Sequence, residues 1–326
     1  MAQARLSRRS LGRLAIGLAA LSIARGAEAT APGSALPRTR AELIPFASAP
    51  FPYEGTKPDD GTEFLDTTGP DGRIGHTSPR GGVYYQDETY SDQRVLVAMP
   101  GGFDLRRRAA IVVFFHGNDA TLQRDVLARQ RVLDQVVESG INAALVAPQF
   151  AVDALDSSAG RFWLPGAFAQ FMSEAALALA GLWGARSARS AFASLPIILV
   201  AYSGGYNPAA YVLKLGGVGK RLHGVILLDA LIAEDDKFAA WIAANRRRAF
   251  FFSAYSESSA DGNTDVMRRL AARGIGYSTR LPPTLSPGLV DFVSTAGVDH
   301  DGYMTEAWVD DPLAWLLSRI PGYARR

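Results

Sequence analysis

The stretch IILVAYSGGYNPAAYVL, residues 197–213, decides the fold class of this 326-residue chain. Four apolar residues lead into the sequence AYSGG, and apolar residues at helical spacing follow at once. A short, solidly apolar run bounded by turn residues is typical of a strand that is buried on both faces of a sheet. The stretch therefore predicts a buried strand, a tight turn that holds Ser203, and a helix.

Strands and helices are predicted to alternate on both sides of this stretch. Further buried strands are predicted at residues 109–117, 141–150, 222–231, 249–256 and 289–297. Helical spacing of apolar residues appears between them, at 121–140, 168–183, 237–245, 264–274 and 311–320. Such alternation predicts a mostly parallel sheet covered by helices on both faces. Two segments with strand-like alternation, 82–87 and 93–100, predict an antiparallel edge before the parallel part.

Residues 1–29 have the pattern of an export signal. A basic start precedes an apolar run at residues 14–23, and the sequence Ala27-Glu28-Ala29 follows as a small-x-small cleavage site. The apolar run is too short to span a membrane. The motif SRRSL, residues 7–11, resembles the twin-arginine export signal of bacteria. We therefore expect a periplasmic or secreted protein that keeps no membrane span once the signal is removed.

The composition of the chain excludes several kinds of site and partner. The chain has no cysteine, which excludes disulfides, thiolate metal sites and a cysteine nucleophile. No basic patch indicates a nucleic-acid partner. Residues 30–81 are rich in proline, glycine, aspartate and threonine and predict a loop-rich amino-terminal arm, followed by the main domain at 82–326. The sequence leaves the oligomeric state open.

Polar residues follow the predicted strands at the edge where parallel sheets bind their ligands. In chain order these residues are His116, Gln149, Ser203, Asp229, Glu257 and His300. A serine hydroxyl is a weak nucleophile unless an imidazole removes its proton, and the imidazole needs a carboxylate to fix its tautomer. The strand ends therefore supply all three parts of an activated serine.

The motif AYSGG, residues 201–205, resembles the Gly-x-Ser-x-Gly nucleophile elbow of the α/β-hydrolase superfamily. Alanine replaces the first glycine, and both flanking residues are still small enough for the chain to turn. The resemblance extends from residue 82 to the carboxyl end. It implies an α/β-hydrolase fold, with a mostly parallel central sheet and helices on both faces, and Ser203 as a nucleophile that forms an acyl-serine intermediate.

Only one of the four histidines follows the last predicted strand, where the superfamily places its general base. This residue is His300. His76 lies in the loop-rich arm, and His223 precedes its strand, at the opposite edge of the sheet. His116 belongs to the motif FFHG, which resembles the oxyanion-loop motif of the superfamily, where the histidine is structural. His300 is therefore the predicted base.

Two carboxylates compete for the role of the triad acid. Asp229 ends the strand after the elbow helix, and Glu257 follows the next strand, the more common position in the superfamily. Asp229 is favoured because an aspartate at the end of an all-apolar strand would be poorly solvated unless it had a polar partner. Glu257 remains the alternative. The less favoured acids are Asp261, Asp299 and Asp301.

Backbone N–H groups are expected to bind the oxyanion of the reaction. The resemblance implies a donor at Gly204, directly after the nucleophile, and a second donor in the loop that begins at Gly117, at Asn118 or Asp119. The predicted substrate pocket is lined by Tyr202, Trp163 and Gln149. The aromatic segment 161–171 has two interpretations, a pocket wall or cap, or simple packing of the following helix.

These features predict an exported serine hydrolase that cleaves an ester or related acyl bond without a metal or another cofactor. Its substrate would be a small-molecule or envelope-derived acyl compound. A peptidase or amidase acting on envelope material would use the same residues, and so could a lyase. A non-catalytic binding module on a hydrolase scaffold is the alternative from a different class.

Overall fold

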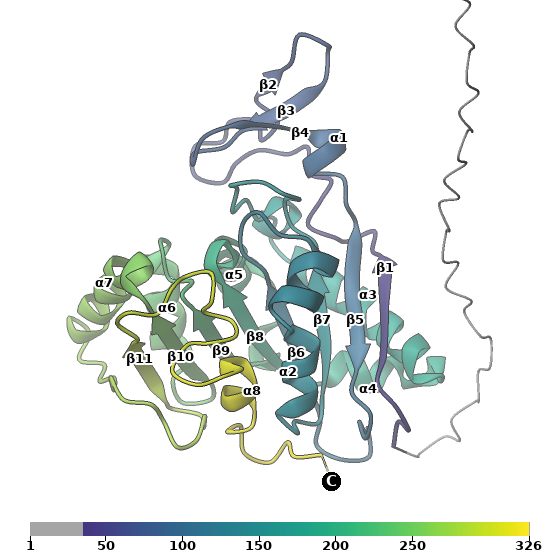
Figure 1. The fold of residues 1–326 in the computed structure, drawn as a ribbon, viewed down its shortest axis with the longest axis vertical. Helices are drawn as coiled ribbons and strands as arrows, with labels where there is room; N and C mark the ends of the chain where they lie inside the picture. The colour runs from purple at the N-terminus through teal and green to yellow at the C-terminus, as the bar shows by residue number, and fades with distance from the viewer. Residues whose placement is uncertain (1–34, 326) are drawn as a thin grey trace, which may run out of the picture.

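The computed structural model describes residues 35–325 and contains one large sheet. Its strands are β1 (Arg40–Pro45), β5 (Arg94–Met99), β6 (Ala110–Phe115), β7 (Ala143–Pro148), β8 (Ile197–Tyr202), β9 (Leu222–Leu228), β10 (Phe250–Tyr255) and β11 (Val290–Ser294). They lie in the order β1-β5-β7-β6-β8-β9-β10-β11 (Figure 1). The strand β5 runs antiparallel to both of its neighbours, and the pairs from β7 to β11 are parallel.

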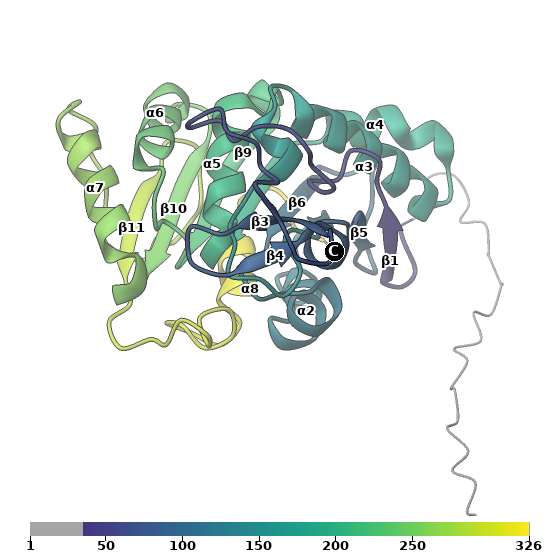
Figure 2. The ribbon, with the colours of Figure 1, turned by 90° about the horizontal axis from the view of Figure 1, so that it is seen from above.

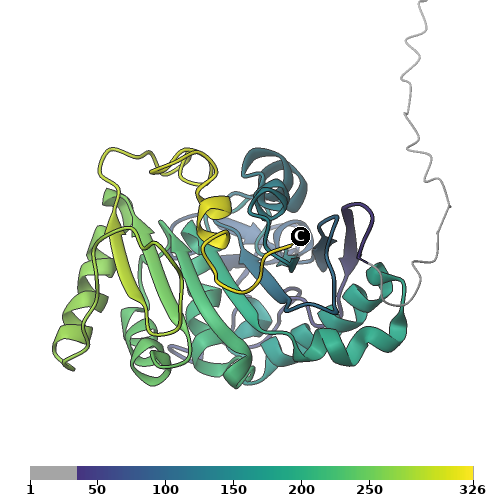
Figure 3. The ribbon, with the colours of Figure 1, turned by 90° about the horizontal axis from the view of Figure 1, so that it is seen from below.

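Helices cover both faces of this sheet. The elements on one face are α3 (Ala167–Trp183), α4 (Arg189–Ser194), α5 (Tyr206–Leu215), α6 (Asp235–Asn245) and α7 (Ala260–Ala271). Those on the other are the π-helical segment η1 (Leu122–Arg129), α2 (Val132–Glu138) and α8 (Pro312–Leu317). Figures 2 and 3 show the sheet between these two layers. The predicted helix at 121–140 is interrupted at Arg131, whose φ of +51° breaks the helical path.

Burial explains why the central strands are solidly apolar. Every residue of β6, β7 and β8 is buried, and successive side chains enter the two cores on opposite faces. For example, Val113 belongs to the core on the face that α3 and α5 cover, whereas Val112 belongs to the core on the face that α2 and α8 cover. The predicted α/β-hydrolase fold, a mostly parallel central sheet with helices on both faces, is confirmed.

The amino-terminal arm differs from its prediction. Within residues 30–81, which the sequence predicts as loop, the strand β1 forms the outer edge of the large sheet. Two further strands, β2 (Thr67–Thr68) and β3 (Ile74–Thr77), pair with β4 (Val83–Tyr85) in a separate three-stranded sheet. The predicted strand at 82–87 forms only at β4, which pairs in the small sheet instead of at the edge of the large one, and the short helix α1 (Gln86–Thr89) begins within the segment. The predicted boundary at residue 82 divides the small sheet between β3 and β4.

The small sheet lies over the carboxyl ends of the parallel strands (Figure 1). It is tied to the loop that follows β7 by side-chain hydrogen bonds. The Ser78 hydroxyl donates to the carbonyl oxygen of Leu155 at 2.6 Å, and the Leu155 N–H donates to the Tyr84 hydroxyl at 3.1 Å. The arm is therefore a fixed part of the edge that carries the polar strand ends.

The predicted export signal at residues 1–29 lies outside the described residues. Across residues 35–325, no helix is both long enough and apolar enough to cross a bilayer. The same part of the chain contains no group of three or more histidine, aspartate or glutamate side chains arranged to hold a metal ion.

Asp291 gives the fold a pH-dependent stability. This β11 residue is only 5% exposed, and burial raises the pKa of its carboxyl to about 6. The folded-state pKa lies above the unfolded one. The contribution of Asp291 to the free energy of unfolding is therefore fully present below about pH 4 and is lost as the pH rises through 6. At pH 8, Asp291→Asn should therefore raise the free energy of unfolding, by about 3 kcal/mol at most.

Urea unfolding of wild type and Asp291→Asn at pH 4.5 and at pH 8 measures this effect. The gain should appear at pH 8 and fall to about a third of that size at pH 4.5. The exposed Asp310 provides the matched control, because Asp310→Asn removes the same charge at the surface. A gain of equal size at both pH values would contradict this account of Asp291.

Candidate active site

Ser203 lies in the turn between β8 and α5, as the sequence predicts. Its φ of +50° is in the left-handed region that residues with a side chain rarely adopt. Glycines make room for this turn. A Cβ atom on Gly205 would lie 2.5 Å from the carbonyl oxygen of Phe115, and one on Gly117 would lie 2.7 Å from the Ser203 Cβ. The turn therefore holds the Ser203 hydroxyl against the end of β6.

His300 connects Ser203 to a carboxylate. Its Nε2 lies 2.8 Å from the Ser203 Oγ, and its Nδ1 lies 2.6 Å from the Oδ2 of Asp229. The imidazole also stacks on the ring of Tyr202, with centroids 5.2 Å apart and an interplanar angle of 22°. The Tyr202 hydroxyl donates to the carbonyl oxygen of His300 at 2.7 Å. Three strand ends, those of β8, β9 and β11, thus place one continuous chain of polar atoms.

Asp229 is fully buried at the end of β9, with a φ of +47°. Its carboxylate accepts the N–H and the hydroxyl of Ser256 at 2.9 and 2.7 Å, the hydroxyl of Ser258 at 2.7 Å, and the hydroxyl of Ser259. Burial favours the neutral acid, but the hydrogen bonds from His300 and the serines outweigh it and hold the pKa of Asp229 well below its usual range. Asp229 is therefore ionised at neutral pH.

The other candidate acids lie elsewhere. Glu257 is exposed, and its neighbouring serines, rather than its own carboxylate, contact Asp229. Between the two carboxylates that the sequence leaves open, the structure places Asp229 within hydrogen-bond distance of His300. The remaining acids Asp261, Asp299 and Asp301 are also exposed. Sequence reasoning missed the serines around Asp229, although the run SESS directly after a predicted strand was available as a signal.

The predicted oxyanion-hole residues gather beside Ser203. Gly117 faces the Ser203 side chain, and a Cβ on Gly204 would lie 2.1 Å from the Asn118 Oδ1. That oxygen accepts a hydrogen bond from the Ser157 hydroxyl at 3.0 Å, which fixes the side-chain amide of Asn118 over the turn. The loop after β6 and the turn at Ser203 are therefore in contact.

Asp119, the second possibility for the loop donor, is engaged elsewhere. Its N–H donates to the carbonyl oxygen of Ala154 at 2.9 Å, and its φ is +50°. This hydrogen bond links the loop after β6 to the loop after β7. The expectation that Asp119 supplies an oxyanion donor is therefore wrong, because its N–H is already used.

Two of the three predicted pocket residues do not line a pocket at Ser203. Gln149 is fully buried, where its Oε1 accepts the N–H of Leu122 at 2.9 Å and its Nε2 donates to the carbonyl oxygen of Ala120 at 3.0 Å. Trp163 packs against Tyr53 of the amino-terminal arm, with ring centroids 5.6 Å apart. Both side chains hold loops in place, and no pattern in the sequence indicates the partners that cover them. The third residue, Tyr202, stacks on His300.

The aromatic segment 161–171 belongs to the core. Phe162, Phe168 and Phe171 are fully buried and pack on one another, with ring centroids 5.2 to 5.9 Å apart. Phe162 also contacts Phe115 at the end of β6. Of the two interpretations of this segment, packing of the helix α3 is the one that the structure shows.

The histidines other than His300 are structural or distant. His116 is buried, its Nε2 accepts the N–H of Phe150 at 2.9 Å, and burial lowers its pKa. These contacts keep the ring neutral within the loop after β6. His76 stacks on Phe64 in the arm, with ring centroids 4.4 Å apart. Both positions agree with the sequence-based assignment of His300 as the base.

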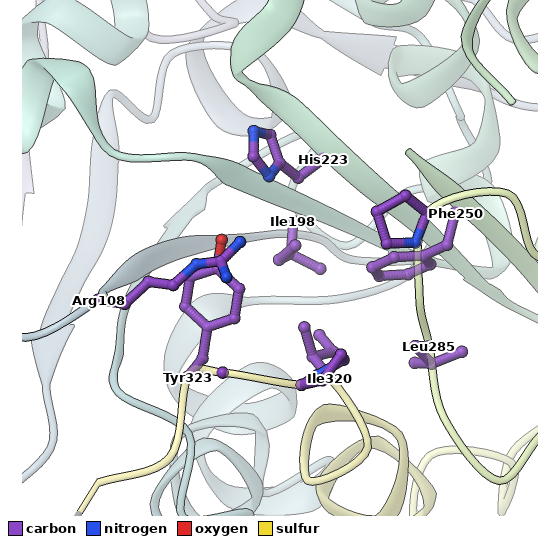
Figure 4. Close-up of a pocket in the computed structure, with 10 residues that line it drawn as sticks. Arg108, Ile198, His223, Phe250, Leu285, Ile320 and Tyr323 are labelled. Carbon is purple, nitrogen blue, oxygen red and sulfur yellow. The ribbon is translucent and has the colours of Figure 1, made fainter. Parts of the chain in front are cut away.

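His223 lies at the start of β9, at the opposite edge of the sheet from Ser203. There it lines a cavity of about 350 Å³ together with Arg108, Phe250 and Tyr323 (Figure 4). Burial and the nearby Arg108 lower the pKa of its imidazole. The cavity is therefore separate from the chain of polar atoms at Ser203.

Gly117→Ala should disable the site without unfolding the protein. The added Cβ would lie 2.7 Å from the Ser203 Cβ and 3.1 Å from its Oγ, so the Ser203 side chain must move. A displacement of about 1 Å in a reacting group lowers rates about 100-fold, and we expect a loss of at least that size in kcat/KM for an ester. Steady-state kinetics measures it, with circular dichroism to confirm folding.

Gly276→Ala is the matched control for this substitution. Gly276 is exposed, and a Cβ there would meet nothing within 4 Å. This variant should keep wild-type activity. If Gly117→Ala were as active as Gly276→Ala, the close approach between the loop after β6 and the elbow would not position the nucleophile.

No family model and no curated protein matches the sequence. Several solved structures are distantly similar to it. A mutant of the feruloyl esterase module from Clostridium thermocellum, complexed with sinapinate, is 15% identical over 84% of this chain and 96% of its own, with a TM-score of 0.45. An S-formylglutathione hydrolase from Staphylococcus aureus is 12% identical over 87% and 98%, with a TM-score of 0.43. Likenesses this distant carry no argument about activity, so activity has to be inferred from the residues around Ser203.

Proposed function

We propose that this chain is an exported serine hydrolase that cleaves an ester or related acyl bond. The observation that carries the proposal is the continuous hydrogen-bonded chain from the Ser203 Oγ through both nitrogens of His300 to the buried carboxylate of Asp229. This is the arrangement that activates a serine hydroxyl for attack on a carbonyl carbon.

Each of these residues takes one role in the proposed reaction. The Ser203 oxygen attacks the acyl carbonyl carbon while the Nε2 of His300 accepts the hydroxyl proton. Asp229 holds the Nδ1–H of the ring and stabilises the imidazolium that forms. The tetrahedral intermediate then collapses, the leaving oxygen takes the proton from His300, and an acyl-serine remains. Water repeats the sequence in the second half and releases the acid.

The oxyanion of both tetrahedral intermediates would be bound at the elbow. The backbone N–H of Gly204 is the first proposed donor, at the start of the turn into α5. The loop at Gly117 and Asn118 supplies the second, and the Ser157 hydroxyl holds that loop against Gly204 through the Asn118 side chain. Fixed donors of this kind stabilise negative charge in the transition state without reorganisation.

The proposed substrate is a small-molecule or envelope-derived acyl compound, and no cofactor takes part. Paired p-nitrophenyl esters and p-nitroanilides of the same acyl groups, from acetyl to octanoyl, test the bond type. Ester hydrolysis that is lost in Ser203→Ala would support the proposal. Cleavage of the anilides alone would favour an amidase. No turnover by well-folded protein on either series would favour a binding module.

The export part of the proposal rests on residues 1–29. Mass spectrometry of the protein recovered from the periplasm or the culture medium of a bacterial host tests it. A mature chain that begins at Thr30 is expected. An unprocessed chain that stays in the cytoplasm would contradict export and would leave the hydrolase proposal untouched.

A further inference from the structure

Three serines surround the carboxylate of Asp229. We call Ser256, Ser258 and Ser259 the serine cage; they lie in the turn between β10 and α7. The Oδ1 of Asp229 accepts the N–H of Ser256 and the hydroxyl of Ser259. The Oδ2 accepts the hydroxyls of Ser256 and Ser258, each at 2.7 Å, in addition to the Nδ1 of His300 at 2.6 Å. Five donors therefore converge on one buried carboxylate.

The five donors saturate the carboxylate, because its two oxygens offer about four lone-pair sites in total. Three of the five donors share the Oδ2, the oxygen that the proposed mechanism needs for His300. Each hydroxyl that donates to the Oδ2 takes up part of the negative charge on that oxygen. Less of that charge then acts on the imidazole. The donors on the Oδ2 therefore compete electrostatically with His300.

Ser258 differs from the other members of the cage. Ser256 and Ser259 are 6% and 1% exposed, whereas Ser258 is exposed at the rim. Its Oγ also lies 3.4 Å from the Nδ1 of His300, so one hydroxyl faces both partners of the Asp229–His300 hydrogen bond. A side chain in this position can be altered without opening the buried part of the cage.

We propose that Ser258 is a positioning residue that tunes the basicity of His300 through Asp229. Its hydroxyl fixes the Oδ2 toward the Nδ1 of the ring and takes up part of the carboxylate charge. The imidazolium is then less stabilised than it would be beside a carboxylate with fewer donors. This inference rests on the proposed function, because it assigns Ser258 to the same site.

Other charged groups near the imidazole remain unchanged when Ser258 is altered. The Tyr202 ring, which stacks on His300, is subject to the charges of Arg129 at the end of η1, of Asp301 and Asp299 in the loop of His300 itself, and of Asp229 on β9. All of these groups are retained in a Ser258 variant. A change in pH dependence can therefore be attributed to the hydroxyl.

Ser258→Ala tests the proposal. Loss of one hydrogen bond to the Oδ2 should move the acid limb of the kcat/KM profile to higher pH by roughly 0.5 to 1 pH unit. The plateau at high pH should change only a few-fold, because the nucleophile and the base are retained. Ser258→Thr keeps the hydroxyl and should restore the wild-type profile. Ser318→Ala, which removes an exposed hydroxyl that donates to the carbonyl oxygen of Trp315, is the matched control.

A second measurement does not depend on activity. In protein with ¹⁵N-labelled histidine, NMR follows the titration midpoint of the His300 ring, and His300→Gln identifies its signals. Ser258→Ala should raise this midpoint by the same amount as the acid limb. If Ser258→Ala does not fold, Ser258→Gly removes the same hydroxyl.

The outcomes separate this inference from the proposed function. Equal midpoints in wild type and Ser258→Ala, or equal behaviour of the alanine and threonine variants, would overturn the role of Ser258. A protein that hydrolyses no ester while the NMR midpoint still moves in Ser258→Ala would contradict the hydrolase proposal and support the electrostatic effect.

Discussion

Ser203→Ala should lower ester hydrolysis by about four to six orders of magnitude, because the proposed acyl intermediate forms on the oxygen that is removed. The alanine keeps the Cβ atom that packs against Gly117, so the turn and its positive φ should survive the change. The effect should fall on kcat, since only the attacking oxygen is removed. Stopped-flow release of p-nitrophenol from an activated ester measures both the burst and the steady state.

The burst phase distinguishes loss of the attacking oxygen from general damage to the fold. Wild type should release up to one equivalent of p-nitrophenol as the acyl-serine accumulates, and Ser203→Ala should release none. Ser318→Ala again serves as the serine-to-alanine control with activity retained. A Ser203→Ala variant that kept more than a few per cent of wild-type activity would place the nucleophile elsewhere.

Asp229→Asn should lower kcat by about three to four orders of magnitude, with a small change in KM. The amide oxygen can still accept the N–H of Ser256, and the serine hydroxyls can rotate to accept from the new NH₂ group. The cage can therefore remain closed. The His300 ring, however, loses the negative charge that stabilises its protonated form and fixes its tautomer.

Glu257→Gln is the matched control for Asp229→Asn. Glu257 is the alternative acid that the sequence leaves open, and its side chain is exposed. Its conversion to the amide should leave kcat within a few-fold of wild type. If Glu257→Gln lost more activity than Asp229→Asn, the acid would be supplied by Glu257 and the loop after β10 would have to rearrange in solution.

Local patterns predicted the central part of the fold. The strands β6, β7 and β8 are buried on both faces, so their apolar runs were unambiguous. The elbow followed from small residues around Ser203, and the position of His300 followed from the order of strands. The two carboxylates were harder to separate, because both follow strands that end at the same edge of the sheet. Only the three-dimensional position shows that Asp229 meets His300.

Long-range contacts account for what the sequence did not reveal. The strand β1 pairs with β5, about fifty residues later, and its six residues alternate poorly between buried and exposed. Trp163 and Gln149 resembled pocket residues because the arm and the loops that cover them are distant in the chain. The serine cage looked like an ordinary polar turn, and its function depends on Asp229, 27 residues before Ser256.

The proposed function requires that Ser203 is a nucleophile activated by His300 and Asp229. The most direct test is to treat the folded mature protein with a fluorophosphonate and to locate the adduct by peptide mass spectrometry. The account predicts a single adduct on Ser203, absent from Ser203→Ala and formed much more slowly in Asp229→Asn. No adduct on well-folded protein, or an adduct on another serine, would contradict it.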